Sequence, residues 1–180
     1  PYRHSWPQLA AHYLSWLAQD EAGDWRFEQG EYQPRSSSLT LPAPESPLPL
    51  KGSIDRIDRN GAGHMRLLDY KTGSSSGLKE KIKTPLEDTQ LPFYALLLGT
   101  EQPQLDSAMY LAVNDKESVQ SLSQTQWQAA ATALQAGMQQ DFQRIYAGAH
   151  LLALGHEEKT CPYCPARGLC RKGQWTVDEA

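Results

Sequence analysis

The chain has 180 residues, a formal net charge of −4 and a sequence pI near 5.7. Hydrophobic residues make up 39% of it and charged residues 21%, which is ordinary for a globular protein with one sizeable core. No apolar run reaches the length of a membrane span, and the first residues lack the apolar region of a signal peptide. We therefore expect neither a membrane protein nor a secreted one.

The first part of the chain predicts a helix followed by strands. Residues 5–19 place leucine and aromatic side chains at helical spacing, a stripe that favours core packing over base stacking. Residues 25–32 are typical of a strand, in which Glu31 is expected to face solvent. Residues 34–49 contain five prolines and several serines, which indicates an edge strand with loops.

The segment 50–73 predicts two strands joined by a glycine-rich turn. Side chains alternate faces along a strand, so Asp69 and Lys71 lie on the same face. If residues 61–63 form a three-residue loop, Asp55 on the first strand falls directly opposite Asp69. A two-residue loop would shift the register by one and separate the two carboxylates.

Two carboxylates beside one ammonium group suit metal-dependent hydrolysis of phosphodiesters. Mg²⁺ and Mn²⁺ prefer oxygen ligands, and a bound metal lowers the pKa of a water and neutralises charge on phosphate. Asp58 faces the other way from Asp55 and is not expected at this site. The alternative is a surface hairpin whose charged side chains form solvated ion pairs of little energetic value.

Mixed elements are predicted after the hairpin. Residues 72–77 (TGSSSG) indicate a flexible loop, residues 87–98 a helix, and residues 106–113 a buried strand. Residues 124–147 are typical of a long amphipathic helix, which we place within a helical segment at 120–148.

Lys79, Lys81 and Lys83 form the one basic cluster near the predicted hairpin. An acidic chain is unusual for a nucleic-acid binder, although positive charge can be local. These lysines either contact phosphates or belong to a solvated segment, and the sequence leaves both open.

The three cysteines of the chain, Cys161, Cys164 and Cys170, lie in a C-x2-C-x5-C pattern. An odd, clustered set without disulfide partners indicates a reducing compartment, here the cytoplasm, and favours a soft metal or an iron–sulfur cluster. A zinc site of three thiolates, completed by His156 or a ligand from outside the chain, is the alternative.

The hairpin motifs G-S-I-D-R-I-D-R and L-L-D-Y-K-T-G resemble the core of the PD-(D/E)XK nuclease superfamily in its RecB-like branch. Q-L-P-F-Y at 90–94 is similar to the Q-x-x-x-Y motif of that branch. The resemblance implies that Asp55, Asp69 and the backbone carbonyl of Tyr70 bind Mg²⁺ or Mn²⁺. It also implies that Lys71 is the catalytic lysine, with Gln90 and Tyr94 supporting the site or contacting DNA.

Members of this branch often add a histidine or glutamate ligand on an upstream helix. His4 and His12 lie in the helical segment, but neither has the surrounding pattern. The cysteine pattern is similar to that of AddB-type nucleases, which implies a [4Fe–4S] cluster whose fourth cysteine lies outside this chain.

We therefore expect an α+β fold, a mixed sheet flanked by helices in the restriction-endonuclease-like core, lacking the first helix of that core. We expect residues 1–180 to form one N-terminally truncated nuclease domain, with a catalytic core at 25–115 and a cysteine segment at 156–175. Its substrate would be DNA ends or single strands in recombination or repair, with a helicase-like region as partner. The alternatives are an inactive nuclease-fold module that binds DNA or a helicase, and a zinc-stabilised interaction domain.

Overall fold

The structure is a computed structural model that describes residues 2–34, 40–41, 48–72, 75–84, 86–99, 104–114, 116, 118–150 and 161–170. The chain divides into two compact units, Pro1–Gln143 and Arg144–Ala180, and each is considered by itself. No helix in the described ranges is long and apolar enough to span a membrane.

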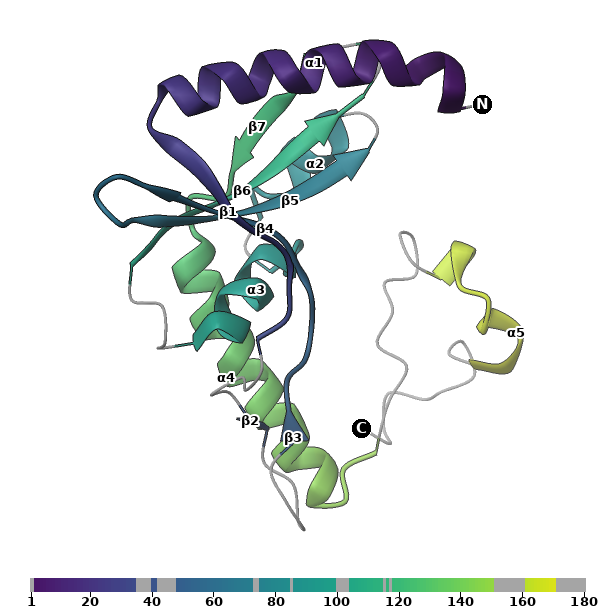
Figure 1. Cartoon of the computed structure of the whole chain (residues 1–180). Coiled ribbons are helices and arrows are strands. Elements are labelled where there is room, and N and C mark those ends of the chain that lie inside the picture. Colours follow the sequence, from purple (N-terminus) through teal and green to yellow (C-terminus); the bar gives the residue numbers. More distant parts are fainter. Residues whose placement is uncertain are drawn as a thin grey trace. The chain divides into compact units, whose positions relative to one another are not determined.

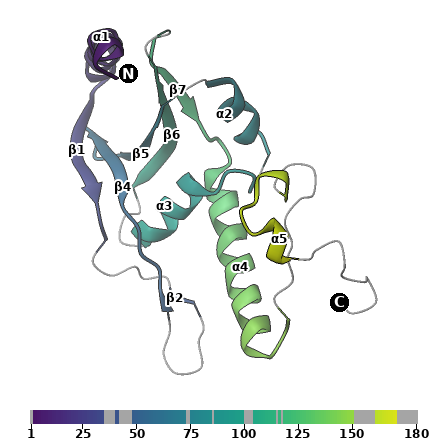
Figure 2. The same cartoon turned by 90° about the vertical axis from the view of Figure 1, so that its right-hand side faces the viewer.

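The first unit is built on a mixed sheet (Figures 1 and 2). Its elements, in chain order, are α1 (Tyr2–Ala22), β1 (Trp25–Tyr32), β2 (Thr40–Leu41), β3 (Leu48–Pro49), β4 (Ile54–Asn60), β5 (Met65–Thr72), α2 (Ser75–Lys81), α3 (Gln90–Leu98), β6 (Leu105–Val113), β7 (Gln120–Ser123) and α4 (Trp127–Tyr146), the last of which runs into the second unit. The second unit adds η2 (Cys161–Tyr163) and α5 (Arg167–Cys170).

The five-stranded sheet has the order β1-β4-β5-β6-β7, and β2 and β3 form a separate two-stranded ladder. Neighbouring strands are antiparallel except β5 and β6, which are parallel. A parallel pair needs a crossover connection, and α2 and α3 supply it here. The crossover brings the start of α3 back beside β5, as the α3–β5 contacts show.

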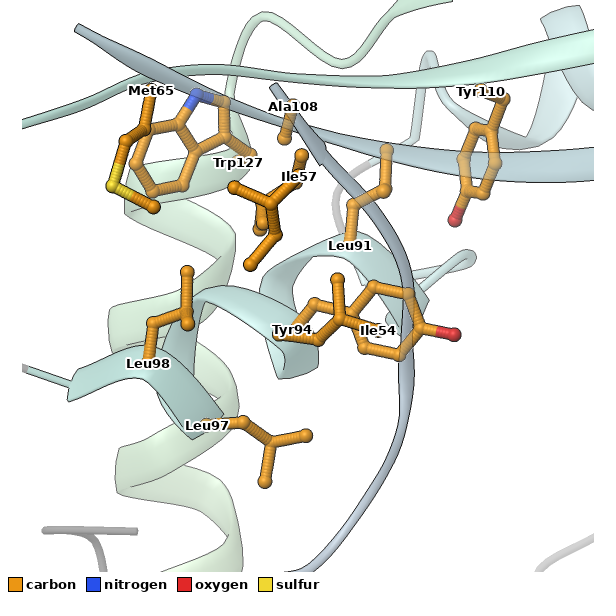
Figure 3. Close-up of a cluster of buried hydrophobic side chains, with 11 residues drawn as sticks. Ile54, Ile57, Met65, Leu91, Tyr94, Leu97, Leu98, Ala108, Tyr110 and Trp127 are labelled. Carbon is orange, nitrogen blue, oxygen red and sulfur yellow. The ribbon is translucent and has the colours of Figure 1, made fainter. Parts of the chain in front are cut away.

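Helices cover both faces of the sheet (Figure 1). Helix α1 packs on one face, where its Leu9 and Trp16 contact a cluster around Leu68 and Leu111. Helix α3 and the start of α4 pack on the other face (Figure 3). That larger cluster consists of Ile54, Ile57, Met65, Leu67, Leu91, Tyr94, Leu97, Leu98, Ala108, Tyr110 and Trp127.

Alternation along β5 explains why the two faces differ. Leu67 and Asp69 point toward α3, whereas Leu68 and Tyr70 point toward α1. A strand covered on both faces is expected to be mostly apolar, and Met65, Leu67 and Leu68 of β5 fit this expectation. The charged residues Arg66, Asp69 and Lys71 of the same strand therefore need partners, which the contacts below supply.

Most predicted elements are confirmed, and the α+β class is correct. The strands at 25–32 and 106–113 correspond to β1 and β6. The long helix corresponds to α4, but its predicted start at residue 120 is wrong, because Gln120–Ser123 form strand β7 and α4 begins at Trp127. The prediction of a flexible loop over 72–77 is wrong from Ser75 onward, because α2 begins at this residue, whose side chain is buried and donates to Gln120. Residues 35–39 and 42–47 of the predicted edge region lie outside the described residues.

The other helices differ from expectation in their bounds. Helix α3 begins at Gln90 and not at residue 87, because Glu87 belongs to the preceding turn, where its N–H donates to Thr84 O at 3.2 Å. We expected the core to lack its first helix, yet the 21-residue α1 directly precedes β1 and lies against the sheet.

Candidate active site

The turn between β4 and β5 has three residues. Asn60 N donates to His64 O at 3.0 Å, and Gly63 N donates to Asn60 O at 2.9 Å. The Asn60 side-chain oxygen also accepts from Ala62 N at 3.1 Å and from His64 N at 2.9 Å. Gly63 closes the turn with a φ of 85°, a conformation that glycine adopts without steric cost. The three-residue loop predicted at 61–63 is confirmed.

This turn sets the register that brings two carboxylates together. β4 and β5 pair from Arg59↔Met65 to Arg56↔Leu68. One step further along the same register, Asp55 lies opposite Asp69. The register prediction is confirmed, and the one-residue slip that would have moved Asp55 to the other face does not occur.

Asp69 is the buried centre of the cluster, with only 1% of its surface exposed. Its Oδ1 accepts from Gln90 Nε2 at 2.5 Å and from Tyr94 OH at 3.2 Å. Its Oδ2 lies 2.5 Å from Lys71 Nζ, so a buried carboxylate and a partly exposed ammonium group form a close ion pair.

Gln90, the first residue of α3, joins the lysine to this carboxylate. Its Oε1 accepts from Lys71 Nζ at 2.5 Å, while its Nε2 donates to Asp69 and, at 2.8 Å, to Tyr94 OH. Gln90 and Tyr94 are four residues apart on one helix, so they meet over one turn. The motif thus holds both charged side chains of β5 from the α3 side.

Asp55 is fixed by the neighbouring strand. Its Oδ2 accepts from the backbone N–H of Tyr70 at 3.1 Å, and the side chain is half-buried. The Tyr70 hydroxyl lies on the opposite face, 3.1 Å from Tyr13 OH and 3.3 Å from Arg56. The backbone at Tyr70 is therefore held from both faces of the sheet.

Burial raises the pKa of Asp69, because a carboxylate loses its hydration there. The Lys71 ammonium lowers that pKa, and the negative charge of Asp55 raises it again, so the overall direction is upward. Burial likewise raises the pKa of Tyr94 to about 12, which keeps its hydroxyl protonated as a donor to Asp69. The cluster gathers more negative charge than one lysine neutralises.

The donor set fits a hard divalent cation. Mg²⁺ is commonly held by one or two carboxylates plus waters and substrate phosphates. Asp55 and Asp69 supply two carboxylates, whose combined negative charge exceeds the positive charge of Lys71. Among the described residues no group of three or more His, Cys, Asp or Glu side chains gathers, so a metal here would need carbonyl, water or phosphate oxygens as well.

Asp58 lies on β4, on the face opposite to that of Asp55, and is completely buried. It pairs with Arg56 Nε at 2.6 Å and with Arg66 at 2.6 Å, and Arg66 also bonds Asp20 of α1. Aromatic rings of Trp16 and Trp25 lie over the two guanidinium groups. This cluster, which we call the arginine–aspartate network, is neutralised and covered by α1. Asp58 points away from Asp55, as predicted.

The other acidic and histidine candidates are placed as follows. Strand β1 pairs with β4 through Gly30 with Arg56 and through Tyr32 with Ile54. Glu31 lies between these two pairs and is therefore a neighbour of Asp55. Glu31 is exposed, as predicted, and its carboxylate accepts from Ser53 at 3.2 Å. His12 lies on the α1 side, 3.3 Å from the carbonyl of Asn114. The side chain of His4 lies outside the described residues.

The basic cluster lies on and after α2. Lys79 and Lys81 are in its last turn and are exposed, and Lys83 is paired with Glu80 at 2.7 Å. The structure brings none of them into the Asp69 cluster, and their contact with phosphates stays a prediction.

Two residues near the cluster, Tyr110 and Asp88, were not predicted from the sequence. Tyr110 of β6 has its ring under Lys71, with 5.1 Å between Nζ and the ring centroid. Its hydroxyl donates to Asp88, just before α3. An apolar strand such as DSAMYLAV predicts a core tyrosine, and only the parallel pairing of Asp69 with Tyr110 reveals the neighbour.

The cysteines belong to the second unit. A one-turn η2 and the short α5 hold them in consecutive turns, with Cys164 N donating to Cys161 O at 3.3 Å and Cys170 N to Ala166 O at 2.9 Å. The three cysteines form no disulfide, and within the described residues they do not gather as a metal-binding group. Their arrangement does not fit a cluster or zinc site as it stands, and His156 lies outside the described residues.

Six predicted residues therefore come together: Asp55, Asp69, Tyr70, Lys71, Gln90 and Tyr94. Their chemical roles stay predictions. Comparison with curated proteins gave no match. A family model, the PD-(D/E)XK nuclease superfamily, matches residues 2–171, which is nearly the whole chain. The chain belongs to the PD-(D/E)XK nuclease superfamily.

Proposed function

We propose that this chain is a Mg²⁺- or Mn²⁺-dependent deoxyribonuclease domain that hydrolyses DNA ends or single strands. The observation that carries the proposal is the meeting of Asp55, Asp69 and Lys71 at the end of β5, where two carboxylate charges face one ammonium group. Members of this superfamily are typically nucleases, which is why DNA is the substrate class we infer.

In this proposal Asp55, Asp69 and the carbonyl of Tyr70 hold the metal. When bound, the metal would lower the pKa of the attacking water and offset charge on the phosphate. Hydrolysis forms a bond from the water oxygen to phosphorus and breaks a phosphorus–oxygen bond, and the leaving oxygen gains a proton.

Lys71 supplies positive charge and hydrogen-bond donors where the phosphate charge grows. Gln90 restricts this flexible side chain by accepting one of its three N–H bonds. Tyr94 and Gln90 together hold Asp69 Oδ1, so the other oxygen is directed toward Lys71. Fixing a reactive group in this way lowers the entropic cost of reaching the transition state.

The test is digestion of single-stranded and duplex DNA with and without Mn²⁺. Lys71→Ala is expected to lower the rate by about 10²–10³-fold, the usual cost of losing one charge-stabilising donor. Lys116→Ala, which removes an exposed lysine, is the matched control and is expected to retain the rate. If the intact chain cuts no better than Lys71→Ala yet still retards DNA, the protein is a binding module without catalysis.

We also propose a role in recombination or repair beside a helicase-like region, in the cytoplasm. The support is the resemblance to RecB-like nucleases and, for the compartment, the three cysteines without a disulfide. Co-purification of the chain with a helicase-like protein, or reading a helicase-like region in the same polypeptide, tests the partner.

The [4Fe–4S] cluster remains a proposal that rests on the C-x2-C-x5-C spacing and the AddB-like resemblance. A fourth ligand would have to come from outside this chain. Metal and sulfide analysis of protein purified without oxygen tests it, with Cys164→Ser as the comparison. Iron and sulfide that Cys164→Ser loses would support the cluster, and zinc without iron would replace it by a zinc site.

A further inference from the structure

Tyr110 is fully buried on the face of the sheet that carries Asp69 and Lys71. Parallel pairing sets it beside Asp69, and it sets the small Ala112 beside Lys71. Figure 3 shows the Tyr110 ring projecting from its strand into the layer that holds α3. The Lys71 ammonium lies 5.1 Å from the centre of this ring, within the range of a cation–π contact.

The Tyr110 hydroxyl continues the contact toward α3. It donates to Asp88 Oδ1, and the same oxygen accepts from the backbone N–H of Gln90 at 3.3 Å. The Asp88 carbonyl accepts from Gln124 at 3.1 Å. Asp88 is thus held by three groups at the point where α3 begins. Burial and the neighbouring Asp88 charge raise the pKa of Tyr110, so its hydroxyl stays protonated and keeps donating.

These contacts form a closed circuit. Lys71 lies over Tyr110, Tyr110 bonds Asp88, Asp88 bonds the Gln90 backbone, and the Gln90 side chain accepts from Lys71 at 2.5 Å. We propose that Tyr110, acting with Asp88, is a positioning residue that fixes the Lys71 ammonium and the Gln90 amide relative to Asp69. The proposal rests on the proposed nuclease function for its kinetic consequence, but its geometry can be tested without DNA.

The ring and the hydroxyl of Tyr110 make separate contributions to this circuit. The ring attracts the ammonium through its negative face and limits where the long lysine side chain can go. The hydroxyl holds the carboxylate that anchors the first residue of α3. Tyr110→Phe removes only the second contribution, whereas Tyr110→Leu removes both.

The spectroscopic test uses the ring current of Tyr110. In the metal-free wild type, the Lys71 Hε protons are expected upfield of the other lysines, because they lie near a ring face. The upfield shift should persist in Tyr110→Phe and disappear in Tyr110→Leu. Lys71 Hε protons at ordinary positions in the wild type would overturn the arrangement, whatever the protein does to DNA.

The kinetic test compares these variants with Leu111→Ala, a matched control. Leu111 is the next residue of β6, is equally buried, and points to the α1 side, so its loss destabilises the sheet without touching Lys71. At a temperature where all the variants are folded, we expect kcat to fall about fivefold in Tyr110→Phe, for one lost hydrogen bond. In Tyr110→Leu we expect a fall of about 10²-fold, the cost of a misplaced catalytic group, with little change in KM.

Leu111→Ala should keep the wild-type kcat. Equal losses of kcat in Tyr110→Leu and Leu111→Ala would show that Tyr110 is only a packing residue and would overturn the proposal. A wild-type chain that cuts no DNA overturns the nuclease function instead, and the ring-current shift then decides the positioning role by itself.

Discussion

The two faces of the β4–β5 hairpin carry similar residues but opposite electrostatics. On the α1 face, Asp58 meets two arginines and the network is sealed by aromatic rings. On the α3 face, Asp55 and Asp69 carry two negative charges against the single positive charge of Lys71. Charge that is fully neutralised inside a protein serves the fold, whereas charge left incompletely neutralised is typical of a functional site.

The largest effect should come from breaking the neutralised face. Asp58→Ala leaves the buried Arg56 and Arg66 without their shared carboxylate, so we expect the free energy of unfolding to fall by about 3–5 kcal/mol. Urea denaturation measures this change. Glu28→Ala, which breaks the half-exposed Glu28–Arg59 pair across β1 and β4, is the control and should cost about 1 kcal/mol or less. Equal losses in the two variants would mean that the α1-face network is not structural.

On the α3 face, removal of a carboxylate charge is expected to keep or raise the stability of the protein, in contrast to its loss on the α1 face. Because the pKa of Asp69 is raised in the folded protein, its ionised form destabilises the fold, and stability falls as pH rises through that pKa. Asp69→Asn removes the charge but keeps the shape, so the metal-free variant should be at least as stable as the wild type at neutral pH. The difference should shrink in acid, where the wild-type Asp69 also becomes neutral. Thermal unfolding in the presence of a chelator, from pH 4 to pH 7, measures this stability difference between Asp69→Asn and the wild type. If the variant loses stability relative to the wild type as the pH rises from 4 to 7, the expected direction is wrong.

The smallest effect concerns Glu31, the edge-strand acid beside Asp55. It is exposed and bonded to Ser53, so Glu31→Gln should change the Mn²⁺-dependent digestion rate by about threefold or less, as expected for an exposed charge. A loss comparable with that of Lys71→Ala would extend the charged face to β1 and make Glu31 a further ligand.

Local pattern predicted the hairpin side of the site well. Alternation and an odd loop were sufficient to pair Asp55 with Asp69, because both depend only on neighbouring residues. The i, i+4 spacing likewise predicts that Gln90 and Tyr94 lie on one face of a helix. The resemblance named their roles in advance, and the family match supports the superfamily but not each role.

Contacts between distant segments could not be predicted in this way. The Tyr110–Lys71 contact depends on the parallel pairing of β5 with β6, which no local spacing reveals. The contacts of Arg66 with Asp58 and Asp20 likewise depend on α1 packing against the sheet, which no spacing along the hairpin reveals. The TGSSSG segment misled because Gly and Ser favour loops locally, while burial of Ser75 and packing of Leu78 favour α2.

Calorimetric titration of metal-free protein with Mn²⁺ tests the contrast between the two faces most directly. The wild type is expected to bind Mn²⁺, and Asp69→Asn should lose this binding while remaining folded. Lys116→Ala, which removes an exposed lysine outside the cluster, should bind as the wild type does. Equal binding by Asp69→Asn and the wild type would contradict the account, because the incompletely neutralised face would then not be a metal site.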